Sequence, residues 1–444
     1  TVKATINSGG AFVVNDGVNN LNLSFKQGSL LRAGQVNTSD LQNLVDNPGS
    51  KKILTATGTF SGANLASTQD SYAFFKTSKE EASGSNLRLS IQSGTSMQDF
   101  ALSSSQRAFA DLLVANRSSG IYTQILGSNH AQAREYYSAF ANDAEFAAVN
   151  NSAINSIMMA SIVKNRGGAN AVNIDKDTRF WIFSGTNRIK SDKDTGIGKL
   201  HSDSFVNLIG IDSLIGDSSS VGVFVGAGRT DDKISGTKEV KSKDFHSGIY
   251  SDIGFEPVKF SFGAIYSKYD RDRKLISSVS PIVYEYVGSN ASSLSAFAQV
   301  SYMGFSNADS FSVEPYAGVS HTRTKIDDVS NSLIRIENKT RNLQAVSIGI
   351  KPSVPFRIGG VGLRASADVA YNRFFSDKQP QAYLCVNGLG GTQLKGEKLQ
   401  NLTTAEAGIE ASLSSRATLK LSYVGAYGSD VKSNGIGLRF RLEF

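Results

Sequence analysis

The chain is poor in the residues that link small secreted proteins and that catalyse reactions in many enzymes. It contains a single cysteine, Cys385, so no disulfide can form within it. Histidine occurs only at His130, His201, His246 and His321, and no carboxylate or nucleophile pattern accompanies these residues. The motifs of serine hydrolases, zinc proteases and phosphate-binding loops are also missing. We therefore expect no catalytic site, no metal site and no cofactor in this chain.

Long apolar runs and blocks of one charge are absent as well. No segment approaches the roughly 18 consecutive apolar residues of a membrane-spanning helix, so strands closed into a barrel are the remaining way across a membrane. The net charge of +7 is spread without a Lys/Arg block, which argues against nucleic-acid binding. The chain opens on Thr1 without a signal-peptide pattern, and we expect it to be a processed piece of a longer precursor.

The last ten residues alternate strictly between large apolar side chains and small or charged ones. Glycine, arginine and glutamate occupy one face between Gly435 and Glu443. A period of two predicts a β-strand, and a strand with lipid outside and water inside has this pattern. The chain then stops on an aromatic residue, which suggests the strand that closes an outer-membrane barrel. The opposite, apolar face carries Ile436, Leu438, Phe440, Leu442 and Phe444.

Strand-like segments follow one another through the region 176–444, and short and long connections alternate between them. This alternation is typical of outer-membrane barrels, whereas a soluble sandwich has no reason to collect its long loops at one end. We expect long loops at 190–202, 230–243, 271–292, 324–342 and 376–401, and short turns near 216–217, 256–257, 306–309, 355–359 and 414–416. Because the strand number is even, both ends of the barrel should lie on the short-turn, periplasmic side. The twelve predicted strands are 180–189, 203–214, 220–229, 244–255, 258–270, 293–305, 311–323, 343–353, 361–374, 402–413, 417–427 and 434–444.

Two regions of different character precede the barrel. Residues 1–102 contain short β-like runs separated by turn signals, which fit either a sandwich or a β-solenoid. Residues 103–175 have helical periodicity, as in Phe109, Leu112 and Leu113. The sequence thus predicts a stem of short strands followed by a helical connector.

The clearest helix of the connector is predicted over Ser152–Lys164, within a pore helix of about 150–166. Asn150 or Asn151 could cap its start, and Gly167-Gly168 could end it. A twelve-stranded barrel has a lumen about wide enough for one helix, so this helix could thread the pore and carry the preceding chain outside. A small amphipathic bundle is the alternative. The predicted apolar stripe consists of Ile154, Ile157, Met158 and Ile162.

Charged residues also alternate onto the predicted lumen face. They could seat the helix and shape the potential of the pore, or they could simply be solvated side chains of a polar lumen. Both interpretations remain open on the sequence. The residues are Glu314, Arg364, Asp368, Glu406, Glu410, Lys420, Arg439 and Arg441.

Four segments resemble the monomeric autotransporters, the type V secretion family in which one polypeptide exports its own N-terminal passenger. They are the terminal strand ending in Phe444, the aromatic-rich run Arg179–Gly185, the Gln-Arg-Ala helix start at 105–110, and the run 53–91, which resembles the last rungs of a passenger β-helix. The connector is similar to those of subtilisin-like protease and adhesin members, so the missing passenger could be an enzyme.

The resemblance implies a monomeric, all-β barrel of twelve strands in the outer membrane, surrounded by lipid, with the residues before the pore helix at the cell surface. It also implies partners: periplasmic chaperones and a barrel assembly machinery that reads the terminal strand. The stem would seed folding of the exported passenger. The alternatives are a twelve-stranded diffusion porin, a surface adhesin without an export role, and a barrel hydrolase, which would need clusters of catalytic residues that the sequence lacks.

The pair Asn150-Asn151 follows Val149, and some autotransporters release their passenger by asparagine cyclisation at a Val-Asn-Asn site. If this chain does so, replacing Asn150 in the full precursor should leave the passenger attached. Immunoblots of cells and medium would measure the release. Unchanged processing would leave the pair without this role.

Overall fold

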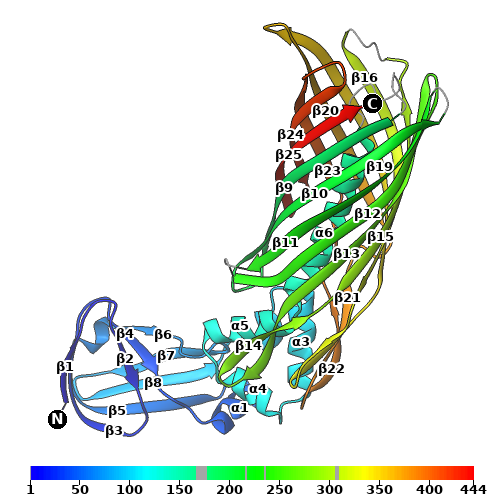
Figure 1. Cartoon of the computed structure of the whole chain (residues 1–444). Coiled ribbons are helices and arrows are strands. Elements are labelled where there is room, and N and C mark those ends of the chain that lie inside the picture. The colour runs from blue at the N-terminus through cyan, green and yellow to red at the C-terminus, as the bar shows by residue number, and fades with distance from the viewer. Residues whose placement is uncertain (1, 167–177, 216–217, 235–236, 306–309) are drawn as a thin grey trace. The chain divides into compact units, whose positions relative to one another are not determined.

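The computed structural model describes residues 2–166, 178–215, 218–234, 237–305 and 310–444, which form two compact units (Figure 1). The first unit contains the chain up to Ala141 and two hairpin tips, residues 278–283 and 386–392. The second contains the remaining residues from Asn142 onward. The predicted turns at 216–217 and 306–309 and the predicted helix end at Gly167-Gly168 lie outside the described residues.

The stem is a β-solenoid, which resolves the choice between sandwich and solenoid. Its strands pair in parallel in two sheets, of which one contains β1, β3 and β5 and the other β2, β4 and β6. Val2 faces Leu21 and Ala11 faces Leu30, the same shift of 19 residues in both sheets, as expected for successive rungs. The strands are β1 (Val2–Ile6), β2 (Ala11–Val14), β3 (Val18–Phe25), β4 (Leu30–Ala33), β5 (Lys51–Ser61) and β6 (Ser67–Gln69).

An antiparallel hairpin covers the last rung of the solenoid. Its strands are β7 (Phe75–Ala82) and β8 (Asn86–Ser93), and β8 pairs antiparallel with β5. The helix α1 (Thr38–Asp46) lies between β4 and β5, before the last rung, and the 3-10 turn η1 (Ala63–Leu65) lies between β5 and β6, within it. Because β8 pairs with the free edge of β5, that edge is no longer open for further strand addition.

The connector folds as four helices. Each begins at a Ser or Asn side chain that accepts a hydrogen bond from a backbone N–H of the first turn, which satisfies one of the free donors there. The rings of Phe109 and Phe140 stack at 4.5 Å, and the hydroxyl of Tyr137 donates to Met97 O at 2.7 Å. Burial raises the pKa of Tyr137, so this hydroxyl remains a donor at high pH. The helices are α2 (Met97–Phe100), α3 (Ser104–Ala115), α4 (Gly120–Leu126) and α5 (His130–Phe140).

The described residues of the second unit contain a closed antiparallel barrel of twelve strands, as predicted. The last strand, β25, pairs with the first, β9, over the whole range from Glu443–Arg179 to Val431–Ser191. The N–H of Phe444 donates to Thr178 O, so the chain ends beside the start of β9. The barrel strands are β9 (Thr178–Asp194), β10 (Lys199–Ile215), β11 (Ser219–Ile234), β12 (Thr237–Phe255), β13 (Val258–Val279), β15 (Ala291–Tyr302), β16 (Ser312–Ile326), β19 (Arg341–Ile358), β20 (Val361–Phe375), β23 (Leu402–Ser412), β24 (Ala417–Tyr427) and β25 (Val431–Glu443).

The prediction of long loops was wrong for much of their length, because the strands continue past the predicted ends. β11 and β12 occupy most of 230–243, and β13 runs on to Val279, where β14 (Ile282–Gly288) follows. Beyond the lipid a strand needs no apolar face, so a loss of apolar alternation does not mark its end. The predicted loops 324–342 and 376–401 likewise contain a small sheet of β17 (Val329–Ser330), β18 (Ile334–Asn338), β21 (Gln381–Val386) and β22 (Gly390–Lys395).

The pore helix α6 (Asp143–Lys164) starts earlier than predicted. Its N-cap is Asn142, at a φ of 63°, so the prediction that Asn150 or Asn151 caps the helix was wrong. Both residues lie inside the helix, where contacts with the barrel outweigh their weak helix propensity. With 22 residues, α6 is roughly 33 Å long, and among the described helices only this one is long and apolar enough to span a bilayer.

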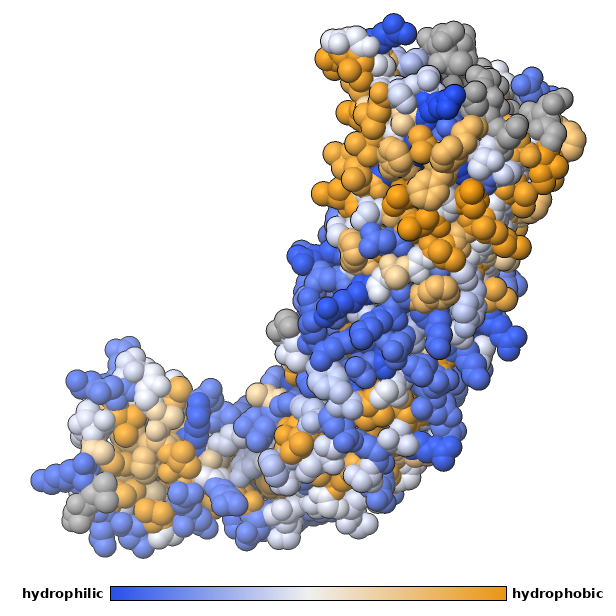
Figure 2. Space-filling view, in the orientation of Figure 1, coloured by the Kyte–Doolittle hydropathy of each residue, from blue (hydrophilic) through white to orange (hydrophobic). Residues whose placement is uncertain are grey.

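Apolar side chains form a band on the outer face of the barrel strands (Figure 2). Residues of the terminal strand contribute to it, with Ile436 59% and Leu438 45% exposed. Large apolar residues also stand at the short-turn ends of the strands, including Phe255, which is 65% exposed. An exposed apolar band of this kind, on a closed barrel, is suited to contact with lipid.

Truncating Phe109 should destabilise the connector, because this side chain is fully buried. Phe109→Ala is expected to cost about 3–5 kcal/mol of unfolding free energy. The measurement is limited proteolysis of the full chain across a urea series, with Leu102→Ala as the control, since Leu102 is 49% exposed. Equal resistance of the two variants would contradict the proposed packing.

Candidate functional site: a helix seated in the barrel lumen

The helix α6 is enclosed by inward-facing side chains of the barrel. Met159, Ile162 and Val163 pack in a cluster with Trp181 and Phe183 of β9 and with side chains of the strands that follow. Ile154, with Ile157 and Met158 partly buried beside it, packs in a second cluster that includes Leu343, Phe374 and Leu402. All four predicted stripe residues lie in α6, and Ile162 packs in a different cluster from the other three. A helix surrounded on all sides has no solvent face and needs no stripe.

Buried ion pairs hold the chain directly after the C-terminus of α6. Arg166 is 2% exposed, and it donates to Asp212 at 3.1 Å and to Asp252 at 2.7 Å. Its guanidinium also lies over the ring of Tyr250, 3.9 Å from the centroid. Arg179 of β9 donates to the other oxygen of Asp212, so one carboxylate joins the chain after α6 to the first barrel strand. A buried charge needs such partners to offset its desolvation.

The last carbonyls of α6 are also satisfied by the barrel. Arg439 of β25 donates to Asn165 O at 2.8 Å and to Ile162 O at 3.3 Å. These carbonyls have no partner within the helix, and a cation at this end complements the helix dipole. The side-chain amide of Asn165 donates in turn to Asp368 and Glu406. The terminal strand thus both closes the barrel and binds the helix inside it.

A second set of ion pairs surrounds the first turns of α6. Glu145 is buried, with Arg271 at 2.8 Å and Arg273 at 3.7 Å. Arg273 also donates to the side-chain oxygen of Asn142, the N-cap. Because Arg271 and Arg273 lie on the long-loop half of β13, the start of α6 lies toward that end of the barrel. Asp212 and Asp252 lie close to short turns, so the helix runs from one end of the lumen to the other.

The two asparagines of the predicted cleavage pair both contact the barrel. The side-chain amide of Asn151 donates to Asp232 at 2.9 Å, and that of Asn150 donates to Glu397 O at 3.1 Å. Asp232 is 5% exposed. The peptide bond between Asn150 and Asn151 therefore belongs to the helix inside the second unit, and the cleavage hypothesis stays a prediction.

The eight predicted lumen residues differ in what they contact. Asp368, Glu406 and Arg439 bond to the end of α6, as described above. Glu314 pairs with Lys259 at 3.2 Å, and Lys420 pairs with Glu406 at 2.6 Å. The other three contact other barrel strands: Arg364 donates to Ser353 on the neighbouring strand β19, and Arg441 of β25 pairs with Glu410 of β23, across β24, at 3.8 Å.

The strongest helix contacts were missed by the sequence analysis, which named none of Glu145, Arg166, Asp212, Asp252 and Arg271. Asp212 and Asp252 do alternate onto the inward face of β10 and β12, so their side was predictable. Their partner was not, because Arg166 is 46 residues from Asp212 and 86 from Asp252.

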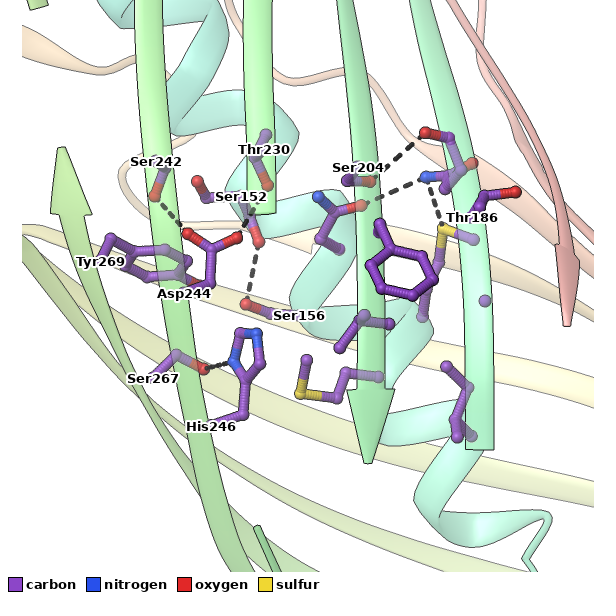
Figure 3. A pocket seen from close by; sticks show the side chains of 18 of the residues that line it. Ser152, Ser156, Thr186, Ser204, Thr230, Ser242, Asp244, His246, Ser267 and Tyr269 are labelled. Atoms are coloured by element: carbon purple, nitrogen blue, oxygen red, sulfur yellow. Dashed lines mark hydrogen bonds between the residues drawn. The ribbon is translucent and has the colours of Figure 1, made fainter. Parts of the chain in front are cut away.

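A small cavity remains between the middle of α6 and the strands β9 to β13 (Figure 3). It has a volume of about 80 Å³, which is enough for several water molecules at about 10–15 Å³ each. Ser152, Ser156, Thr230, Asp244 and His246 contribute polar groups to its lining.

The polar groups of this cavity do not form a catalytic triad. The Nδ1 of His246 lies 2.9 Å from Ser267 Oγ, but among the described hydrogen bonds Asp244 accepts from Thr230 and Ser242 instead of from the imidazole. A triad needs the carboxylate on the second ring nitrogen. Within the described residues, no group of three or more acidic, histidine or cysteine side chains could hold a metal ion.

A closed twelve-stranded barrel with an apolar outer band and a helix in its lumen defines a class of outer-membrane translocator barrels. The chain belongs to the autotransporter β-domain family, whose model matches residues 180–424. No curated protein is significantly similar to the chain.

Solved structures of autotransporter domains are similar to it. The β-domain of the Bordetella autotransporter BrkA aligns at 16% identity and a TM-score of 0.48, over 60% of this chain and 100% of that one. The translocator domain of NalP from Neisseria meningitidis aligns at 11% identity and 0.49, over 67% and 98%. The transport unit of AIDA-I from Escherichia coli aligns at 14% identity and 0.45, over 64% and 97%.

Replacing Arg166 by Gln should loosen the end of α6, because Asp212 and Asp252 then lose a buried cation. Breaking such a pair costs about 3–5 kcal/mol. Hydrogen exchange of the folded chain in detergent should show faster exchange over the last turns of α6. The matched control is Arg188→Gln, which removes an Arg–Asp pair from the outer surface, where Arg188 is 60% exposed. Equal exchange in the two variants would contradict the proposed anchoring.

Proposed function

We propose that the chain is the translocator end of an autotransporter and exports its own N-terminal passenger to the cell surface. The main support for this proposal is the path of α6. The helix starts near the long-hairpin end of the lumen, and the chain reaches the short-turn end at Arg166. In this proposal, the chain before Asn142 leaves the barrel at the outer end. Family membership supports the same role.

The residues before α6 would then lie outside the cell, and the solenoid rungs of the stem would seed folding of the passenger. A directional folding step outside is a physically reasonable source of bias, because no nucleotide is available in the periplasm. β1 is the edge strand of its sheet, so its free backbone groups could pair in parallel with a strand of a further rung. The activity of the passenger itself would be determined by the residues upstream.

Assembly of the barrel would depend on the terminal strand. Its five outward residues, Ile436 to Phe444, present the alternating apolar face that an assembly machinery could recognise once periplasmic chaperones deliver the chain. We propose that the barrel acts as a monomer, since its own strands close it. The porin alternative is less favourable, because α6 and its ion pairs occupy the lumen through which solutes would pass.

Protease treatment of intact cells tests the proposed topology. A tag placed at the exposed Gly49 turn of the stem should be lost from intact cells, while the barrel survives as a protected fragment. Lysed cells provide the control in which the tag is accessible in every case. Survival of the tag in intact cells, with loss only after lysis, would rule out surface exposure.

A further inference from the structure

A cluster of exposed cations lies on the outer face of the barrel, at the long-loop border of the apolar band. It consists of Lys243 on β12, Lys268 on β13, and Arg323 and Lys325 on β16. Each is exposed and lies between buried neighbours, so each points away from the lumen. We call these four residues the cationic cluster.

The sheet register brings the cluster together. Lys268 pairs with Ser292 of β15, and Ser292 pairs with Lys325, so the two lysines flank β15 at one level. Two strand spacings of about 4.8 Å put their backbones about 10 Å apart. Arg323 lies two residues closer to the apolar band than Lys325, opposite Leu294. The cluster therefore spans a width suited to one compact anionic headgroup.

In the part of the chain that the structure describes, no carboxylate forms an ion pair with a cation of this cluster. The neighbouring cations, in contrast, do have carboxylate partners. Arg188 and Lys233 share Asp203. Arg229 pairs with Asp231, and Lys274 pairs with Glu239. Among the described contacts, none of the four cluster side chains has an ion pair or hydrogen bond.

Two carboxylates of β13 lie at the edge of the cluster. Asp270 faces Lys243 across the sheet, and Asp272, two residues further from the apolar band, faces Lys241. Counting both carboxylates leaves the four cations a formal charge of four minus two, or +2. Asp327 follows the end of β16, on the side away from the apolar band. The cluster thus keeps an excess of positive charge at the border of the band.

Large apolar side chains begin directly below the cations. Phe245, Tyr266 and Leu294 are 48%, 43% and 53% exposed. Lys268 lies ten residues from the short turn before Val258, and at about 3.3 Å per residue and a tilt of 35–45° this is roughly 25 Å of height, the thickness of the apolar band of such barrels. The cluster therefore lies at the boundary between lipid and water.

We propose that the cationic cluster binds the phosphate-bearing headgroup of an acylated lipid in the outer leaflet. The phosphates would lie among Lys268, Arg323 and Lys325 and accept charge-assisted hydrogen bonds from them. Ser292 on β15, between Lys268 and Lys325, would add a hydroxyl donor. The acyl chains would lie on Phe245, Tyr266 and Leu294. A lipid satisfies both halves of the surface, whereas a free phosphate would use only the cations. The proposal needs the barrel in an outer membrane and does not depend on export.

The experiment compares the full chain, folded in detergent, with the variant Lys268→Gln/Arg323→Gln/Lys325→Gln. The probe is lipid A, an acylated glucosamine disaccharide with two phosphates, and native mass spectrometry measures the bound lipid. The variant should bind lipid A about 10- to 100-fold more weakly. Each Lys or Arg near an anionic lipid surface contributes a roughly equal increment of binding free energy, and the variant loses three of them. The control Lys3→Gln/Lys26→Gln/Lys76→Gln removes three exposed charges from the stem and should bind as the native chain does.

Three outcomes would overturn the proposal: equal affinity of the triple variant, equal affinity of the native chain for dephosphorylated lipid A, or equal occupancy by inorganic phosphate alone. Heat-modifiable migration on gels checks folding of each variant. If the triple variant does not fold, Lys268→Gln alone should weaken binding about fivefold, and no change would again overturn the proposal. Surface exposure of the stem tag in the triple variant separates a failure here from a failure of export.

Discussion

Backbone hydrogen bonding inside a bilayer is the constraint on which the other features of this protein depend. A strand in lipid has no water to bond its N–H and C=O groups, so an open sheet edge there is too costly to persist. The pairing of β25 with β9 removes both edges at once. Because twelve strands close in this way, the first and last strand start and end at the same side, and the lumen between them is wide enough for a helix.

The closed lumen in turn explains the character of α6. A helix on the surface of a soluble domain buries one stripe, but α6 contacts the barrel wall around its circumference. Its middle is apolar and its ends are charged. At the C-terminal end Arg439 donates to free carbonyls of the helix, and Arg166 pairs with carboxylates of the barrel. At the other end Arg271 and Arg273 pair with the carboxylate of Glu145 in the first turn. Each of these arginines is buried, so its charge interacts more strongly than it would in water.

The type of side chain on the outer face of the barrel changes along the strands, from the short-turn end to the long-loop end. Apolar side chains occupy the band, cations and carboxylates follow at its long-loop border, and beyond it the strands continue as polar hairpins. The continuation is possible because hydrogen bonding between neighbouring strands does not depend on what surrounds the side chains. The same alternation that faces lipid in Phe262 and Tyr266 faces water in Asp270 and Asp272.

The period-two pattern of the sequence was sufficient to predict twelve strands, their inward and outward faces, and the short-turn side on which Phe444 lies. The helices around Phe109 and Tyr137 were also predictable, since their periodicity and caps are local. The start of α6 at Asp143, the partners of Arg166 and Glu145, and the length of the outer hairpins were not. These depend on contacts between residues 46 to more than 200 positions apart, such as Arg166 with Asp212 and Arg439 with Asn165.

By itself the sequence determined which side of each strand meets lipid, because alternation is a property of neighbouring residues. Only the tertiary structure decided which charges meet the helix, because closing the barrel is what brings distant strands around it.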